Sequence, residues 1–316
     1  MDTNTSDGND SLDWSRINFT KAESFSWFVV IVAELLVTFI LNLITIIVFA
    51  KQRQLQRRST YLIIHLAIVD LLVGAVSGPL CLIPPLTNVS LEFLPSILSR
   101  LFPIASATTL TAISLERLHV TFCPFRHLTV KKRAYVETIF VIWVISISLE
   151  IIQTFAMQRN LFSISAIVYF SYFSSVITII SVSYFSICIK VRRSRHLQHE
   201  SMAIRNREKR LTTSLIIVTF ASLLTLSPVF IYVTIQIFFS IPELSPTKAS
   251  GIRFFLAGVL SLGLNSSINP LIYSITNSEF RTGLARICCR RHRRHPIHAI
   301  PAVSPGSFRL REFRRP

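Results

Sequence analysis

The chain has 316 residues, of which 51% are hydrophobic and only 16% are charged, and its mean hydropathy is +0.53. This composition is too apolar for an ordinary soluble domain, so we expect a bilayer to be the solvent. The formal net charge of +17 must then be explained within a membrane protein.

Seven apolar segments follow one another along the chain, each close to the roughly 20 residues that a helix needs to cross the hydrocarbon. Because the backbone finds no water there, each segment should be helical. The sequence predicts an all-α membrane protein with a polar tail at 1–24, a seven-helix bundle at 25–275 and a disordered tail at 291–316. The predicted helices run over 25–50, 60–83, 96–121, 135–156, 161–190, 211–240 and 251–275.

Basic residues divide unequally between the two sets of connections that seven spans create. One set, which includes the segment after 276, holds 27 of the 33 Lys and Arg residues. Because positive charge stays in the cytoplasm, we expect a multi-pass protein of the plasma membrane with its N-terminus outside. Topology and contact with anionic membrane lipids explain the basic loops better than nucleic-acid binding does, and we expect no nucleic-acid partner.

The predicted outer side has its own signals. Four glycosylation motifs of the form N-x-S/T fall on it, at Asn4, Asn9, Asn18 and Asn88. No cysteine lies in a predicted outer loop, so an extracellular disulfide is not expected.

A few polar side chains interrupt the apolar helices, and such residues are costly enough to be functional candidates. Asp70 in the second helix is either a hydrogen-bonded structural acid or a ligand. Neutral oxygen donors in neighbouring helices favour the second reading, because a carboxylate surrounded by such oxygens suits a small hard cation. These donors are Ser106, Asn265, Ser266 and Asn269, with Asn42 in the first helix.

Charged residues mark the inner ends of the third and sixth helices. Glu116 and Arg117 end the third, and Glu208 lies among four basic residues at the start of the sixth. Arg117 either extends to the membrane surface, with Glu208 merely solvated, or forms an ion pair with Glu208 that can be broken.

Short motifs in a fixed order resemble those of the rhodopsin-like (class A) G-protein-coupled receptors, over all seven helices. They are "LN", "LAIVD", "LERL", a Trp in helix four, a Tyr in helix five, "SP", "NPLIY" and "NSEFR". Their characteristic residues are Asn42, Asp70, Arg117, Trp143, Tyr184, Pro228, Asn269, Pro270, Tyr273 and Phe280.

The resemblance implies a receptor without enzymatic activity that transmits a ligand signal to heterotrimeric G proteins. It also implies a short amphipathic eighth helix at 276–290. Glu116 and Glu208 would restrain Arg117 in the inactive state, Tyr184 and Tyr273 would be its partners in the active state, and Asn269-Pro270 would bend. Asp70, Ser106, Asn265, Ser266 and Asn269 would form an allosteric sodium pocket; no other cofactor is implied.

Several positions depart from the family pattern. Glu92 stands where the family usually has a cysteine at the outer end of helix three, and Val176 stands where it has a helix-five proline. Leu226 and Ser222 replace the helix-six Trp and Phe, and Leu118 replaces the Tyr that follows the helix-three Arg. Ser99 stands where amine receptors have an Asp, and Gly263 where opsins have the retinal Lys. An amine ligand and a retinal chromophore are therefore not expected. Some departures are shared with the melanocortin, cannabinoid, lysophospholipid and adenosine receptors.

The expected ligand pocket is mostly apolar, which suggests an apolar or peptide ligand. Its candidate residues are Ser99, Arg100, Pro103, Val168, Leu226, Val229, Phe230, Phe255 and Val259. Arg100 could extend to the outer headgroups or bind an acidic ligand group. Two more membrane acids, Glu34 and Glu150, need partners that the sequence does not identify.

The cytoplasmic tail begins with two cysteines, Cys288 and Cys289, followed by "RRHRRH". They are either palmitoylation sites beside basic headgroup contacts or plain thiols. Three alternatives to a ligand-activated receptor remain: a receptor that signals without ligand, a seven-helix transporter and an intramembrane enzyme. No internal repeat favours the transporter, and no catalytic motif favours the enzyme.

Overall fold

The computed structural model describes residues 21–52, 60–82, 89–194, 217, 220–235, 238, 249–276 and 278–288. All regular structure in these residues is helical. Six helices are long and apolar enough to cross a membrane, and the shorter apolar helix Phe220–Ile235 lies inside the sixth predicted segment. The predicted all-α membrane bundle is therefore confirmed.

The helices start and end close to the predicted positions. The six long spans belong to α1, the α2–η3–α3 run, α4, α6, α7 and α9. The bounds are α1 Lys21–Lys51, α2 Thr60–Leu72, η3 Val73–Ser77, α3 Gly78–Leu82, α4 Val89–Phe122, α5 Pro124–Thr129, α6 Lys132–Gln158, α7 Phe162–Ser194, α9 Ala249–Thr276 and α10 Ser278–Cys288.

Two local features were not predicted. The second span contains a π-helical turn, η3, in which the Gly78 N–H bonds the Val73 carbonyl oxygen five residues earlier. The short helix α5 follows the third span, and it begins with Pro124, whose fixed φ and missing N–H suit a first helical position.

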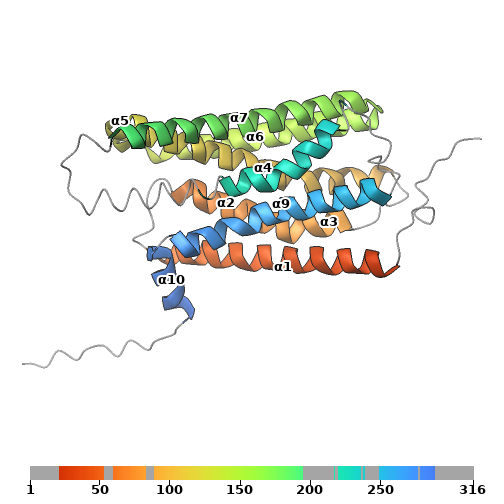
Figure 1. Cartoon of the computed structure of the whole chain (residues 1–316), viewed down its shortest axis with the longest axis horizontal. Helices are drawn as coiled ribbons and strands as arrows, with labels where there is room; N and C mark the ends of the chain where they lie inside the picture. Colours follow the sequence, from red (N-terminus) through yellow and green to blue (C-terminus); the bar gives the residue numbers. More distant parts are fainter. Residues whose placement is uncertain are drawn as a thin grey trace, which may run out of the picture.

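The long helices lie side by side along one axis, as Figure 1 shows. Helix α4 packs against α2, α6 and α7, while α1 packs against α2 and α9. Helices α5 and α10 lie at the same end of the bundle, and α10 turns away from its axis. On α10, Phe280 is buried while Arg281 and Arg286 are exposed, so this helix is amphipathic, as the resemblance implied.

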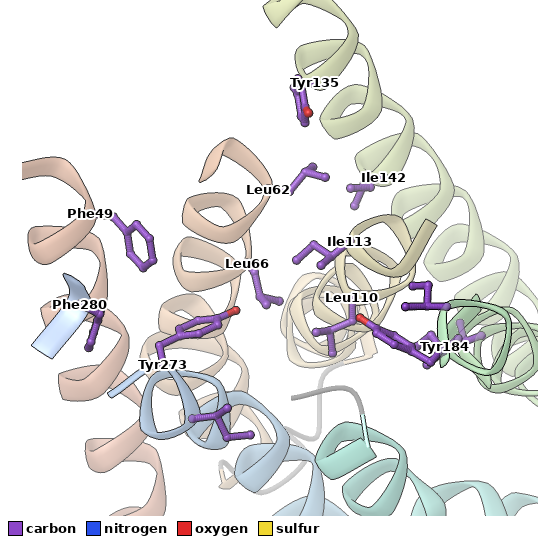
Figure 2. Packing of buried hydrophobic residues seen from close by; sticks show 14 of the residues in the cluster. Phe49, Leu62, Leu66, Leu110, Ile113, Tyr135, Ile142, Tyr184, Tyr273 and Phe280 are labelled. Atoms are coloured by element: carbon purple, nitrogen blue, oxygen red, sulfur yellow. The ribbon is translucent and has the colours of Figure 1, made fainter. Parts of the chain in front are cut away.

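The largest apolar cluster fills the half of the bundle next to α5 and α10. It is made of residues from α1, α2, α4, α6, α7, α9 and α10, several of which are labelled in Figure 2. Many large apolar side chains instead point outward, among them Phe140, Phe185 and Ile275, which are 68–71% exposed. In a bilayer this surface faces lipid, so its exposure has no hydrophobic cost.

Candidate functional site

Asp70 is completely buried in the middle of the bundle. The Ser106 hydroxyl donates a 2.6 Å hydrogen bond to Asp70 Oδ1, and Asn269 Nδ2 donates a 2.9 Å bond to Asp70 Oδ2. Ser266 is a further hydrogen-bond partner of the same carboxyl group. The structure thus joins α2, α4 and α9 at one acid and brings together four of the five expected pocket residues.

Asn265, the fifth expected residue, has a different partner. Its Oδ1 accepts a 3.1 Å hydrogen bond from Thr225 Oγ1 on the Phe220–Ile235 helix. The Ser261 hydroxyl bonds the backbone carbonyl oxygen of the same threonine. Asn265 and Ser261 therefore connect α9 to the sixth helix, next to the carboxyl cluster.

Pro270 lies inside α9 and has no N–H, so the carbonyl oxygen of Ser266, four residues earlier, loses its helical partner. Asn42 Nδ2 of α1 donates a 3.1 Å hydrogen bond to this oxygen and a 2.9 Å bond to Thr38 O. A polar side chain can replace the N–H that the proline lacks. Asn42 does so from a neighbouring helix, which ties α1 to α9 at the weakened turn.

The oxygen atoms around Asp70 fit a small cation. Asn269 Oδ1 is buried and has no hydrogen-bond partner among the described residues. Together with the Asp70 carboxylate and the hydroxyls of Ser106 and Ser266, it offers the hard oxygen ligands that such ions prefer. The described residues contain no group of three or more His, Cys, Asp or Glu suited to a metal. One carboxylate among neutral oxygens suits a monovalent ion such as sodium.

A second polar cluster lies where α4 ends. Arg117, with 9% of its surface exposed, places one guanidinium nitrogen 2.8 Å from Glu116 Oε2. The Tyr135 hydroxyl of α6 donates a 3.1 Å hydrogen bond to Glu116 Oε1, and His127 Nε2 of α5 lies 3.9 Å from the same oxygen. Arg117 is therefore held by its own neighbour. Glu208, the other expected restraint, lies outside the described residues.

Two tyrosines separate these polar clusters. Tyr184 of α7 and Tyr273 of α9 are both buried, and Figure 2 shows their hydroxyl groups pointing toward each other beside Leu110. The ring of Tyr273 also packs edge-on against Phe49 at a centroid distance of 6.2 Å. The two tyrosines belong to the apolar cluster in the half of the bundle next to α5 and α10, and their role as partners of Arg117 stays a prediction.

Comparisons with known proteins agree with this arrangement. The family described as "7 transmembrane receptor (rhodopsin family)" matches residues 41–273, which include both polar clusters. The chain belongs to this family. This receptor is therefore a multi-pass membrane protein of a family of signalling receptors, not of enzymes. The subgroup suggested by its departures from the family pattern stays a prediction.

Two relatives place the receptor within this broad family. A 5-hydroxytryptamine receptor 2B of Dichotomyctere fluviatilis is 34% identical over 118 residues, which are 35% of this chain and 25% of that receptor. The crystal structure of squid rhodopsin superposes with a TM-score of 0.68 at 20% identity, and the match covers 84% of this chain and 85% of that one. The second likeness concerns the fold alone.

The expected ligand-pocket residues of the receptor are distributed over several environments. Leu226 is buried, Phe230 stacks on Phe170 of α7 at 5.5 Å, and Ser99 donates its hydroxyl hydrogen to Ser96 O. Phe255 is 54% exposed, so the structure does not enclose it. The remaining candidates, Pro103, Val168, Val229 and Val259, are half-buried.

Arg100 has partners that the sequence did not identify. Its Nε lies 3.0 Å from Glu150 Oε2 of α6, and its terminal nitrogens donate to the hydroxyls of Ser96 and Thr154. Glu150 is completely buried, and its other oxygen accepts a 3.1 Å bond from the Tyr169 hydroxyl of α7. In the structure, Arg100 links α4 to α6 and α6 to α7 through Glu150, and its contacts with headgroups or an acidic ligand stay predictions.

Glu34, the other acid without an assigned partner, lies against α9. Its Oε1 accepts a 2.7 Å hydrogen bond from Thr38 in the next turn of α1. A Cβ atom at Gly263 would be only 2.1 Å from Glu34 Oε2, so this glycine provides the space for the carboxyl group. Nearer the start of α1, Glu23 forms a two-point ion pair with Arg253 of α9.

The remaining predicted sites lie where the structure gives no information on them. Asn4, Asn9, Asn18 and the tail segment with Cys289 lie outside the described residues, as does Asn88. Cys288 ends α10, but its side chain is not described. Glycosylation and palmitoylation at these positions stay predictions.

Proposed function

We propose that this receptor lies in the plasma membrane with its N-terminus outside, binds a ligand in the outer half of the bundle and activates heterotrimeric G proteins at its cytoplasmic end. Arg117 is the observation that carries the proposal: a nearly buried guanidinium held by one adjacent carboxylate at the end where α5 and α10 lie. An ion pair that can exchange partners is the kind of two-state element that a ligand can bias.

The short helix α5 supports the same location for G-protein contact. Phe125 is 84% exposed on this helix, immediately after Pro124. A large apolar side chain at the cytoplasmic surface beside the Arg117 cluster is a suitable anchor for a protein partner. Basic side chains of the same loop and the amphipathic α10 would instead contact membrane lipids.

The direct test is nucleotide exchange on a panel of purified G proteins with the receptor in lipid nanodiscs. Arg117→Ala should reduce exchange at least about tenfold if its contacts stabilise the coupled state by more than about 1.4 kcal/mol. Phe125→Ala is a second interface variant, and Phe140→Ala, on the lipid-facing surface of α6, is the matched control. Equal exchange by all variants would contradict the proposal.

The ligand class follows from two positions. Ser99 offers no counter-ion to an amine, and Glu34 fills the space at Gly263 where a retinal lysine would stand. We therefore expect an apolar or peptide ligand. The panel should include lipids, nucleosides and peptides, and it should begin with the receptor alone. High exchange without ligand, abolished by Arg117→Ala and unchanged by every ligand, would favour the ligand-independent alternative. The buried aliphatic Leu226, at the position where the family has a helix-six Trp, supports this alternative.

We also propose that sodium binds Asp70 with Ser106, Ser266 and Asn269 and favours the inactive state. The unpartnered Asn269 Oδ1 beside a buried carboxylate supports this. Sodium chloride, compared with potassium chloride at equal ionic strength, should lower basal exchange and raise the melting temperature of the receptor. Asp70→Asn should remove both differences, whereas Glu34→Gln, which changes another half-buried acid, should keep them.

A further inference from the structure

Glu116 faces an arginine and a histidine side chain. Its Oε2 is 2.8 Å from Arg117, while its Oε1 accepts from Tyr135 and lies 3.9 Å from His127 Nε2. The Glu116 side chain is only 10% exposed. A carboxylate so little exposed needs a compensating charge, because water cannot supply it.

The proposed function, on which this inference rests, requires Arg117 to leave Glu116 when the receptor couples to a G protein. Glu116 then loses its nearest cation, and the hydrogen bond that it keeps among the described contacts comes from the neutral Tyr135 hydroxyl. The free energy of this step therefore depends on whether another positive charge is already close to Glu116.

His127 is held in the position from which it can supply that charge. Its backbone N–H donates a 2.9 Å hydrogen bond to Cys123 O in the first turn of α5, which Pro124 initiates. Its ring packs edge-on against the ring of His119 of α4 at a centroid distance of 5.8 Å, and its side chain is 19% exposed. Histidine is also the side-chain type that changes its charge close to neutral pH.

We propose that His127 is a positioning residue for G-protein activation: as an imidazolium it replaces Arg117 as the cation beside Glu116 and so favours release of Arg117. Other titratable or charged groups lie on the elements that form or adjoin this contact and contribute to its response. They are Glu116, Arg117 and His119 on α4, Arg126 on α5, Lys131 before α6, Lys132, Arg133 and Tyr135 on α6, and Tyr61 of α2, whose ring packs against that of Tyr135.

The direction of the pH effect follows from this exchange of partners. A neutral His127 leaves Glu116 without a cation once Arg117 has moved, which disfavours the coupled state. A protonated His127 removes part of that cost. Basal nucleotide exchange should therefore rise as the cytoplasmic-side pH falls from about 8 to about 6. Because the contact is partly exposed and 3.9 Å long, we expect a modest change of about two- to fivefold.

The test uses the full-length receptor in nanodiscs, with G-protein nucleotide exchange measured at several pH values and the receptor-free rate subtracted at each. His127→Arg carries a permanent charge and should give high exchange without a pH slope. His127→Gln should give low exchange without a slope. His119→Gln is the matched control, because it removes the neighbouring imidazole and should keep the slope.

Two results would overturn the inference. One is a wild-type slope that persists in His127→Gln, and the other is a slope that disappears equally in His119→Gln. In both cases the proposed function stands, because exchange itself is observed. If the wild-type receptor catalyses no exchange with any G protein at any pH, the proposed function and this inference both fail. The melting temperature of each variant, measured at the same pH values, separates loss of folding from loss of coupling.

Discussion

The two ends of the bundle satisfy their buried polar groups in different ways. In the middle and in the half next to α5 and α10, which is the inner half in the proposed orientation, Asp70 is bonded by neutral donors, and the buried ion pair of Glu116 with Arg117 joins adjacent residues of one helix. Toward the other end, opposite charges pair between helices, as Arg100 and Glu150 do. The comparison suggests that the outer contacts fix the helices while the inner contacts can exchange partners.

This division of roles makes the two regions respond differently to substitution. Variants of the buried outer contacts should lower stability and leave the sodium and pH responses intact, whereas variants of the inner contacts should also change those responses. The predictions below run from the largest expected effect to the smallest, and each is measured as the change in free energy of unfolding or melting temperature in detergent micelles.

Glu150→Ala should have the largest effect. It leaves the Arg100 guanidinium and the Tyr169 hydroxyl without their shared partner, and an uncompensated charge is costly where water is scarce. We expect a loss of about 2–4 kcal/mol, with the lower end favoured because the Arg100 side chain is 32% exposed. The double variant Arg100→Met with Glu150→Leu should recover most of the loss. A loss as large in the double variant as in Glu150→Ala would contradict the ion-pair explanation.

Gly263→Ala should come next. The added methyl group would collide with the Glu34 carboxylate, and relieving the overlap must move α1 or turn the acid away from Thr38. Because the colliding atoms are the far end of a flexible side chain, the main cost is the hydrogen bond between Thr38 and Glu34, and we expect a loss of about 1–2 kcal/mol. Glu34→Ala in the same chain should largely restore stability, because it empties the space. Gly258→Ala, where a Cβ atom would be 3.4 Å from Val229, is the matched control and should cost much less.

Asn42→Ala tests the inner region at its connection to α1. The substitution removes the donor that compensates for Pro270, so the Ser266 carbonyl oxygen is left buried without it. We expect a loss of about 1–2 kcal/mol. Thr45→Val is the control, because the Thr45 hydroxyl bonds only a carbonyl of its own helix in the described contacts. Equal losses in both variants would show that the hydrogen bond between α1 and α9 stabilises the receptor no more than a hydrogen bond within one helix.

Glu23→Ala should have the smallest effect, although its ion pair with Arg253 is the two-point pair among the described side chains, with bonds of 2.6 and 3.0 Å. Both groups are solvent-exposed, and such pairs are screened and lose side-chain entropy. We expect no change in melting temperature beyond experimental error. A clear decrease in melting temperature that disappears at high salt would show that this ion pair stabilises the contact between α1 and α9 more than its exposure indicates.

The sequence predicted the fold well because the bilayer restricts it so strongly. Hydropathy located the spans, and basic loops indicated an orientation. The neighbours of Asp70 were predictable because Ser266 and Asn269 share one face of α9, three residues apart. Arg100 and Glu150 were each noticed as charges in apolar helices. They could have been paired, since each lies only a few residues from the outer end of its predicted span.

Other contacts could not be predicted from sequence spacing. The partner of the Pro270 turn is Asn42, which is more than 220 residues away in sequence, and nothing in the local sequence marks it as that partner. His127 lies in a loop whose short helix α5 is too small to give a periodic signal. Its approach to Glu116 depends on where that loop folds back, which is a property of tertiary packing.

The π-helical turn at Val73–Ser77 has a consequence for anyone aligning this chain with its relatives. A π turn accommodates one more residue than an α turn, so the side chains that follow are rotated by about 100° relative to an uninterrupted helix. If positions are counted outward from Asp70 with the regular helical period, residues 80–82 would therefore be placed on the wrong face of the helix. An alignment with a relative whose second span is a continuous α-helix should therefore carry a one-residue gap at this turn.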